Sequence, residues 1–157
     1  MTMTRRTLVT GLAVTALAST VPFRFVAAQS TPVVTVEKSA TCGCCIAWIE
    51  HLEENGFTVE AKNVSSGALT QSKMAAGLKP EHFSCHTAKV DGYVVEGHVP
   101  AADIRKLLAE RPDAAGLSVP EMPIGSPGMD FGDDREPYDV LLIARDGSAS
   151  VFSSYNR

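Results

Sequence analysis

Beyond its N-terminal segment, this 157-residue sequence lacks long apolar runs, internal repeats, low-complexity tracts and any excess of basic residues. A membrane-spanning helix needs about eighteen consecutive apolar residues, so we expect no stable membrane insertion of the mature chain. Without residues 1–28, the chain keeps 11 of its 14 Lys and Arg and all 18 Asp and Glu, which gives a formal net charge of −7. Because phosphate backbones are bound by basic patches, we expect no nucleic-acid partner.

The first 28 residues have the layout of a cleaved export signal. A pair of arginines in Thr4–Leu8 is followed by the uncharged stretch Leu8–Val21 and by the small residues Val26–Ala28. Paired arginines ahead of a mildly apolar stretch resemble a twin-arginine signal. We therefore predict a signal peptide over residues 1–28 and one domain over residues 29–157, located in the periplasm. The alternative is a single N-terminal membrane anchor, for which the apolar stretch is short.

The remaining sequence alternates β-type segments with segments of helical spacing. The predicted strands cover Pro32–Glu37, Phe57–Ala61, Thr87–Val90, Tyr93–Glu96, Tyr138–Ala144 and Ser148–Phe152. The predicted helices cover Ile46–Glu53, Ala68–Ala76 and Pro100–Leu108. Asp-Gly pairs at 91–92 and 146–147 separate neighbouring β-type segments, which is a strong signal for a hairpin. Residues 116–130 are rich in Gly and Pro and predict a structured loop with neither helix nor strand.

This order of elements predicts an α/β fold, and its first two-thirds resembles the thioredoxin-like arrangement. We expect a thioredoxin-like mixed sheet flanked by helices, with a Pro/Gly-rich loop and a C-terminal β-hairpin. In that fold a cysteine motif lies between the first strand and the next helix. The residues just before the first hairpin, here Ser84–His86, should face that motif. Thioredoxins have a cis-proline at the facing position, where this sequence has a cysteine and a histidine.

The candidate functional residues are the four cysteines, Cys42, Cys44, Cys45 and Cys85. Three of them fall within four positions just before a predicted helix, and the fourth adjoins a histidine. A helix N-terminus stabilises thiolates through its free N–H groups and the positive end of its dipole. Thiolate is both the nucleophile of redox chemistry and a metal ligand, so the placement suits either function.

Two interpretations rest on disulfide chemistry of the cysteines and not on a bound metal store. Two disulfides would be ordinary in an exported protein. One pairing joins Cys42 to Cys45 and Cys44 to Cys85, because the adjacent Cys44 and Cys45 can bond only through a strained ring. Alternatively, Cys42 and Cys45 form the dithiol of a thioredoxin-like thiol oxidoreductase or of a copper-linked redox protein. The two additional cysteines would then offer competing disulfides.

The metal interpretation accounts for all four cysteines. Soft thiolates select Cu(I), zinc or iron–sulfur clusters. Cu(I) accepts two or three sulfur ligands and thiolates can bridge ions, so the four residues could hold one ion or a multinuclear copper–thiolate site. Zinc requires a tetrahedral set, which needs the adjacent Cys44 and Cys45 to point inward together.

The four histidines have different expected roles. His86 adjoins Cys85 and is the best candidate for a fifth ligand or for a donor that orients a ligand. His98 is expected to be a loop residue near the start of a helix, and His51 to be a surface or packing residue. His82 lies three residues before Cys85 and could approach the site.

Three further side chains are expected in the core. Met122 and Met129 lie in the Pro/Gly-rich loop, where methionine commonly fills gaps in a core. The alternative is that this loop lies near copper, because a thioether is a soft ligand. Trp48 on the first predicted helix is interpreted as a core residue.

These motifs together resemble one bacterial family, the CopG-like metal-binding family of periplasmic copper resistance. The motifs that carry the resemblance are Cys42–Cys45 with Trp48, Ser84–Thr87, Asp91–Pro100, Met122-Pro123 and Gly125–Met129. The resemblance covers essentially the whole mature chain, about Val33 to Phe152.

The resemblance implies a thioredoxin-like domain that binds Cu(I) through Cys42, Cys44, Cys45, Cys85 and His86. Zinc and Ag(I) are alternative metals. The family is linked to copper and silver tolerance alongside efflux systems, so periplasmic copper efflux or chaperone proteins are the expected partners. We therefore predict sequestration or handover of copper, and an enzymatic activity is less expected than metal binding.

Overall fold

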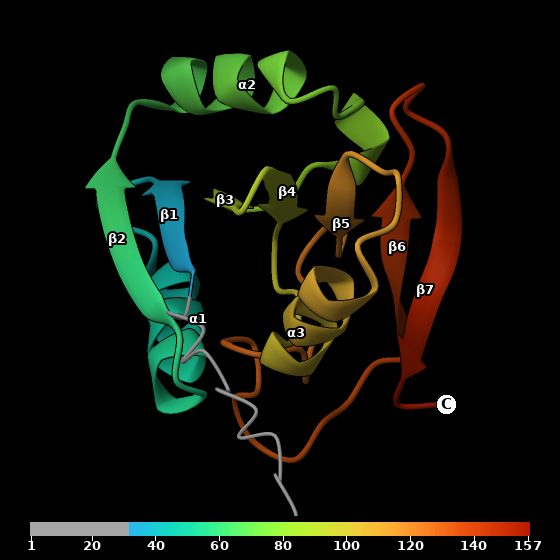
Figure 1. Ribbon diagram of the computed structural model, residues 1–157. Coiled ribbons are helices and arrows are strands. Elements are labelled where there is room, and N and C mark those ends of the chain that lie inside the picture. The colour runs from blue at the N-terminus through green and yellow to red at the C-terminus, as the bar shows by residue number, and fades with distance from the viewer. Residues whose placement is uncertain (1–31) are drawn as a thin grey trace, which may run out of the picture.

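The computed structural model describes residues 32–157, so the predicted signal peptide over residues 1–28 lies outside the described part. Within residues 32–157, seven strands, three α-helices and one 3-10 helix, η1, follow one another (Figure 1). Their bounds are β1 Val33–Lys38, α1 Gly43–Glu54, β2 Thr58–Asn63, α2 Ser66–Ala75, η1 Pro80–His82, β3 Thr87–Val90, β4 Tyr93–Glu96, α3 Ala101–Glu110, β5 Gly116–Ser118, β6 Tyr138–Ile143 and β7 Ala149–Tyr155.

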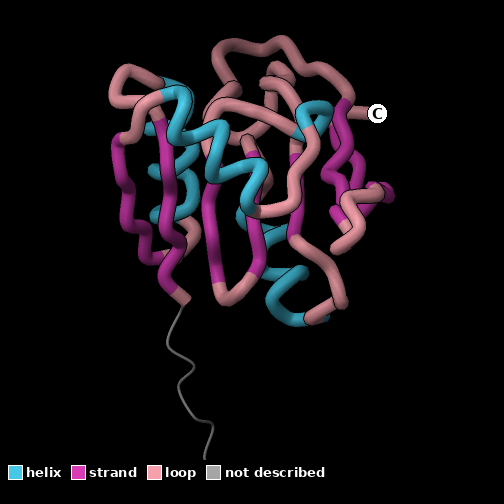
Figure 2. The backbone as a smooth tube through the Cα atoms, turned by 90° about the horizontal axis from the view of Figure 1, so that it is seen from above, coloured by secondary structure: helices cyan, strands magenta, loops and turns pink. Residues whose placement is uncertain are grey.

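The strands form one mixed sheet in the order β2-β1-β3-β4-β5-β6-β7. The pairs β1–β2 and β4–β5 are parallel, and each pair is connected through a helix, as parallel neighbours require. The remaining neighbours are antiparallel. The α2 helix lies on one side of the sheet, with α1 and α3 on the other (Figure 1), and it crosses the strands when seen from above (Figure 2). The α/β thioredoxin-like prediction is confirmed.

Both predicted hairpins are present. Asp91 and Gly92 both have positive φ, at 47° and 88°, which is the backbone conformation of the tight turn that Asp-Gly favours. At the second hairpin, the Asp146 carboxylate accepts hydrogen bonds from the N–H and hydroxyl groups of Ser148, and Gly147 has a φ of 77°. Strand β7 extends to Tyr155, three residues beyond the predicted strand.

The largest core cluster lies between the sheet and the two helices on its α1–α3 side. Trp48 and Leu52 of α1 and Ile104 and Leu107 of α3 are completely buried there against strand residues. The Trp48 indole N–H also donates to the Val99 carbonyl oxygen at 2.9 Å. Its predicted core position is therefore confirmed, and it anchors the helix that carries three of the cysteines.

The prediction that residues 116–130 contain no strand is wrong for residues 116–118. Strand β5, Gly116–Ser118, pairs with β4 on one side and with β6 on the other. A Cβ atom at Gly116 would collide with the Val94 carbonyl oxygen, so only glycine lets strands β4 and β5 approach so closely. Three residues are too few to show an alternating pattern, and pairing with two formed strands decides their conformation.

Candidate metal centre

The first cysteine motif lies at the beginning of α1. Cys42 precedes the first helical residue and has extended backbone angles, while Cys44 and Cys45 lie within the first turn. No side chain caps the helix start. The cysteines therefore lie at the end of the helix that has free N–H groups and the positive end of the dipole, as the sequence predicts.

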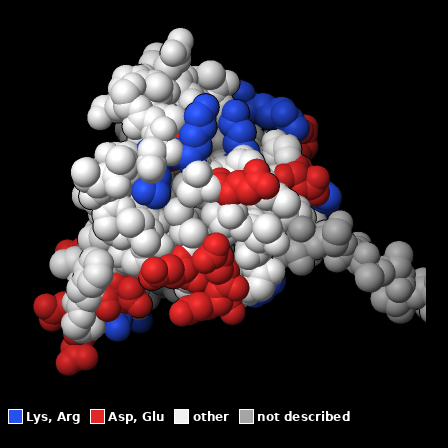
Figure 3. All heavy atoms as spheres, turned by 90° about the vertical axis from the view of Figure 1, so that its left-hand side faces the viewer, with Lys and Arg blue, Asp and Glu red and all other residues white. Residues whose placement is uncertain are grey.

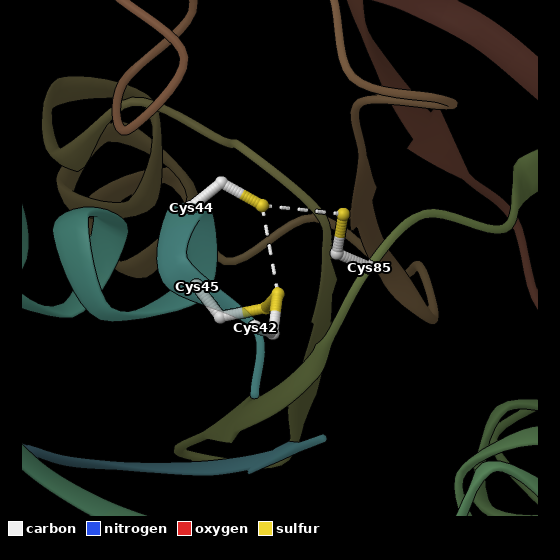
Figure 4. A group of neighbouring side chains, drawn as sticks. All are labelled: Cys42, Cys44, Cys45 and Cys85. Carbon is white, nitrogen blue, oxygen red and sulfur yellow. Dashed lines mark hydrogen bonds between the residues drawn. A yellow bond between two sulfur atoms is a disulfide. The ribbon is translucent and has the colours of Figure 1, made fainter. Parts of the chain in front are cut away.

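The fold brings all four cysteine sulfur atoms together. They lie within 4.8 Å of one another, although Cys44 and Cys85 are 41 positions apart in sequence. The Cys44 sulfur is 3.5 Å from that of Cys42 and 3.6 Å from that of Cys85. Figure 4 shows Cys85 reaching the helix start from a neighbouring chain segment. The prediction that the segment before the first hairpin faces the first motif is therefore confirmed.

Two of the four cysteines are oxidised in this structure. Cys42 and Cys45 form a disulfide, and Cys44 and Cys85 are free thiols. Cys45 is completely buried, whereas the other three are partly exposed at the surface. The sulfur atoms of the adjacent Cys44 and Cys45 both belong to the group of four, so both residues can contribute to one site.

The Cys85 thiol is in an environment that disfavours its charged form. Burial raises the pKa of Cys85 to about 12, and its hydrogen bond with Cys44 acts in the same direction. The positive charge of Lys73 opposes this shift. Because a metal binds the thiolate, metal binding at Cys85 must release a proton.

His86 follows Cys85 in the sequence and is completely buried. Its ring lies 4.3 Å from the Trp48 ring and 5.1 Å from the His98 ring, measured between centroids. Neither ring nitrogen has a hydrogen-bond partner among the described residues. Burial, the neighbouring His98 and Lys73 all lower its pKa well below the usual value. The imidazole is therefore neutral and can offer a lone pair to a metal, although its nitrogens fall outside the group of four sulfur atoms.

Each of the other three histidines has one ring nitrogen within hydrogen-bonding distance of a backbone group, although Nε2 of His98 has no partner among the described residues. His98 is the predicted loop residue, completely buried, and its Nδ1 lies 2.8 Å from the Pro127 carbonyl oxygen. His51 packs between helices, where its Nε2 accepts a hydrogen bond from the Ala101 N–H. His82 does not join the cysteine group, because its Nδ1 faces the N–H group of Lys79 at the start of η1.

The segment between β5 and β6 covers one side of the cysteine cluster. Gly128 packs on α1 so closely that a Cβ atom there would lie 2.7 Å from the Cys44 carbonyl oxygen. At the other end of the segment, Glu121 forms an isolated parallel bridge with Ser84. Sequence reasoning did not single out Gly128, because a glycine in a Gly-rich loop gives no sign of its neighbour.

Met122 is 48% exposed, so the prediction that it fills the core is wrong. It borders an open hollow of about 580 Å³ together with Cys85, Phe83, Ser84 and Glu121. The bridge between Ser84 and Glu121 holds this part of the loop at the surface. Met129 is partly buried. The loop therefore lies beside the cysteine site, as the alternative interpretation requires.

A buried ion pair lies behind the Cys85 segment. Lys73 of α2 and Glu96 of β4 contact each other, with their side chains 4% and 0% exposed. Burial raises the pKa of Glu96, and the charge of Lys73 opposes that rise. Sequence reasoning missed both residues, because an isolated Lys on a helix and a Glu at the end of a strand are usually exposed.

The surface formed by β2 and α1 carries charges of both signs. Acidic side chains predominate on its lower part, and most of the visible Lys and Arg side chains lie higher, next to further acidic ones (Figure 3). Three exposed acids of α1 are Glu50, Glu53 and Glu54.

Within residues 32–157, no helix has both the length and the apolar character that crossing a membrane requires.

Comparisons with known proteins agree with this geometry. A family model described as "Protein of unknown function, DUF411" matches residues 82–129, which include Cys85 and most of the Pro/Gly-rich loop. The solved structure "Copper resistance protein copG- Form 2" is 46% identical, with a TM-score of 0.75, and the match covers 81% of this chain and 100% of that chain. "Copper resistance protein copG- Form 1" is 45% identical, with a TM-score of 0.76, and covers 82% and 100%.

The chain belongs to the CopG family of copper resistance proteins. No match is found among the curated proteins. The CopG neighbours have the same fold, so the resemblance drawn from the motifs is confirmed. Membership of the CopG family and the cluster of four sulfur atoms together indicate a copper-related role and a site able to bind a metal.

Proposed function

We propose that this protein binds Cu(I) through Cys42, Cys44, Cys45 and Cys85, with His86 as a fifth ligand or as a donor that orients one. The observation that carries this proposal is the meeting of four sulfur atoms within 4.8 Å of one another, from two separate chain segments. Disulfides alone would not need a neutral imidazole next to Cys85 in the sequence, with no hydrogen-bond partner among residues 32–157.

The donor set fits copper better than zinc. Thiolates are soft ligands, and Cu(I) accepts them in twos or threes with sulfur atoms as bridges. A cluster that joins a helix start to a facing loop can therefore hold one Cu(I) ion or a small multinuclear copper–thiolate site. Ag(I) shares this chemistry, whereas zinc would require all four sulfur atoms at the corners of one tetrahedron.

The copper is cargo, and the protein sequesters it or passes it onward. We propose export by a twin-arginine signal over residues 1–28 and a periplasmic location for the domain over residues 29–157. Copper efflux or chaperone proteins of the periplasm would be the partners. Thiolate ligation keeps copper reduced and inaccessible, which limits its oxidative damage.

Loading requires the reduced protein. The Cys42–Cys45 disulfide removes two of the four thiolates from the donor set. Two electrons and two protons convert that disulfide to two thiols, and metal binding then displaces the thiol protons. A reductant in the periplasm, or arrival in the reduced state, is therefore part of this proposal.

The decisive experiment is an anaerobic Cu(I) titration of the reduced mature protein against a chromophoric Cu(I) chelator. We expect stoichiometric binding with a sulfur-to-copper charge-transfer band. The matched control replaces all four cysteines with serine, which keeps the side-chain size and removes the soft ligands. Equal copper retention by the two proteins would rule out the cysteine site.

A second candidate function is a thiol oxidoreductase or a copper-linked redox protein, and the Cys42–Cys45 disulfide is the observation that favours it. Such a protein would turn over with a dithiol donor and would lose that activity in the single Cys42→Ser variant. A copper store shows no turnover, and its metal content falls in steps as successive cysteines are replaced.

A further inference from the structure

The segment Ser84–Thr87 carries Cys85 and His86. Unlike the first cysteine motif, it does not lie at the start of a helix. Thioredoxins have a proline at the corresponding position, and proline itself restricts the backbone. Here Ser84, Cys85 and His86 have ordinary backbone freedom, yet the Cys85 sulfur must remain within reach of Cys44. A metal site needs its ligands held to about half an ångström, so another device must hold this segment.

The buried pair Lys73–Glu96 makes the contacts that such a device requires. One Glu96 carboxylate oxygen accepts a hydrogen bond from the Ser84 N–H at 2.7 Å, and the other accepts from the Thr87 hydroxyl at 2.6 Å. The Lys73 ammonium donates to the Ser84 carbonyl oxygen at 3.1 Å. The pair therefore holds residues on both sides of Cys85 and His86.

Stability alone does not account for this pair. Removing two charges from water is costly, and apolar side chains of similar volume often stabilise a core equally well. Charged hydrogen bonds add directional geometry that apolar packing does not provide. Lys73 belongs to α2 and Glu96 to β4. The pair therefore fixes the position of Ser84 relative to these two rigid elements.

We propose that Lys73 and Glu96 are positioning residues that hold Cys85 opposite the Cys42–Cys45 motif. This inference deepens the proposed function and rests on it for its effect on copper. Its effect on the backbone of Ser84–Thr87 is independent of any metal. The two parts are therefore tested by separate measurements on the same variants.

The main test variant is Lys73→Met/Glu96→Leu, which removes the charged contacts without leaving a single buried charge. A second variant, Lys73→Met/Glu96→Gln, keeps an amide oxygen that can accept from the Ser84 N–H. The matched control is Asp103→Asn. Asp103 is also a buried carboxylate, and it accepts hydrogen bonds from Ser153 and Tyr155, away from the cysteines.

The first measurement is hydrogen–deuterium exchange of the reduced, metal-free proteins. In Lys73→Met/Glu96→Leu we expect the peptide over residues 83–87 to exchange about tenfold faster, while the start of α1 is unchanged. The second measurement is Cu(I) affinity by chelator competition. Disruption of groups that orient ligands typically lowers metal affinity 10- to 100-fold, so we expect the Cu(I) affinity of the main variant to fall by about tenfold or more. The Gln variant should fall between the main variant and the wild type.

Each outcome decides one point. Wild-type exchange over residues 83–87 together with wild-type Cu(I) affinity in the main variant would overturn the positioning role. An equal loss of affinity in Asp103→Asn would show a general stability effect and would also overturn it. If the wild-type protein itself binds no Cu(I), the proposed function fails, and the exchange data alone decide the positioning role. If the main variant does not fold, the Gln variant supplies the same comparison.

Discussion

The two segments that carry the cysteines are built in different ways. Residues 42–45 begin a helix, so their arrangement follows from local backbone hydrogen bonds and from the anchor at Trp48. Residues 84–87 reach the site through contacts with α2, β4 and the loop at Glu121. One half of the site is therefore formed by local interactions, whereas the other half depends on distant parts of the chain.

The two segments also differ in their chemistry. The first lies at a helix N-terminus, which favours thiolates, and it contains the disulfide. In the second, burial raises the pKa of Cys85 to about 12, and the residue is a free thiol. One segment is therefore suited to redox change, and the other requires a metal or a base to become charged.

The largest expected effect concerns the oxidation state of the first segment. Protein with the Cys42–Cys45 disulfide should lose stoichiometric Cu(I) binding, because two of the four thiolates cannot ligate. Copper-to-protein ratios after anaerobic desalting, with and without prior reduction, test this expectation. Equal ratios would mean that Cys44 and Cys85 suffice, and that the two segments do not share the copper.

The second prediction tests how strongly the Cys85 segment depends on distant groups. Glu96→Gln leaves the Lys73 charge buried without its partner, so the free energy of unfolding should fall by about 3–5 kcal/mol. Urea unfolding monitored by circular dichroism measures this loss in the free energy of unfolding. The control is Asp139→Asn, which weakens the partly exposed pair with Arg157 and should lower the free energy of unfolding far less. Similar losses in both variants would contradict the assigned role of the buried pair.

The third prediction concerns acid. Burial lowers the pKa of the completely buried His86 and His98, so the unfolded chain binds more protons than the folded one once the pH falls below about 6.5. The free energy of unfolding of metal-free protein should therefore decrease on acidification, by up to about 1.4 kcal/mol per pH unit for each histidine.

Urea unfolding at pH 7.5 and at pH 5.5 measures this acid dependence. His51→Gln should keep most of this dependence, because His86 and His98 are completely buried whereas His51 is only partly buried. A flat profile in the wild type would show that these side chains are not held neutral in the folded state.

The smallest expected effect is at Gly43, inside the first cysteine motif. A Cβ atom there would contact nothing within 4 Å, and the residue is helical. Gly43→Ala should therefore raise the free energy of unfolding by about 0.5 kcal/mol, since alanine loses less conformational entropy. Copper binding should be unchanged. A clear loss of either would show that the first segment also depends on contacts beyond its own helix.

Much of the fold could be predicted from local patterns. The Asp-Gly turns, the alternating strands and the core position of Trp48 all follow from signals within a few residues. Strand β5 could not be predicted, because its three residues become a strand only by pairing with β4 and β6. Met122 could not be placed either, because its exposure results from the bridge between Glu121 and Ser84.

Local sequence is enough to predict the chemical identity of the candidate site: four soft ligands, three of them at a helix start, and a histidine beside the fourth. The geometry of these residues depends on contacts between distant segments. These contacts bring the Cys85 sulfur to 3.6 Å from that of Cys44, bury His86 against Trp48, and join Lys73 and Glu96 to Ser84. The physical reason is that helix starts and tight turns depend on neighbouring residues, whereas buried ion pairs and facing loops depend on contacts between distant segments.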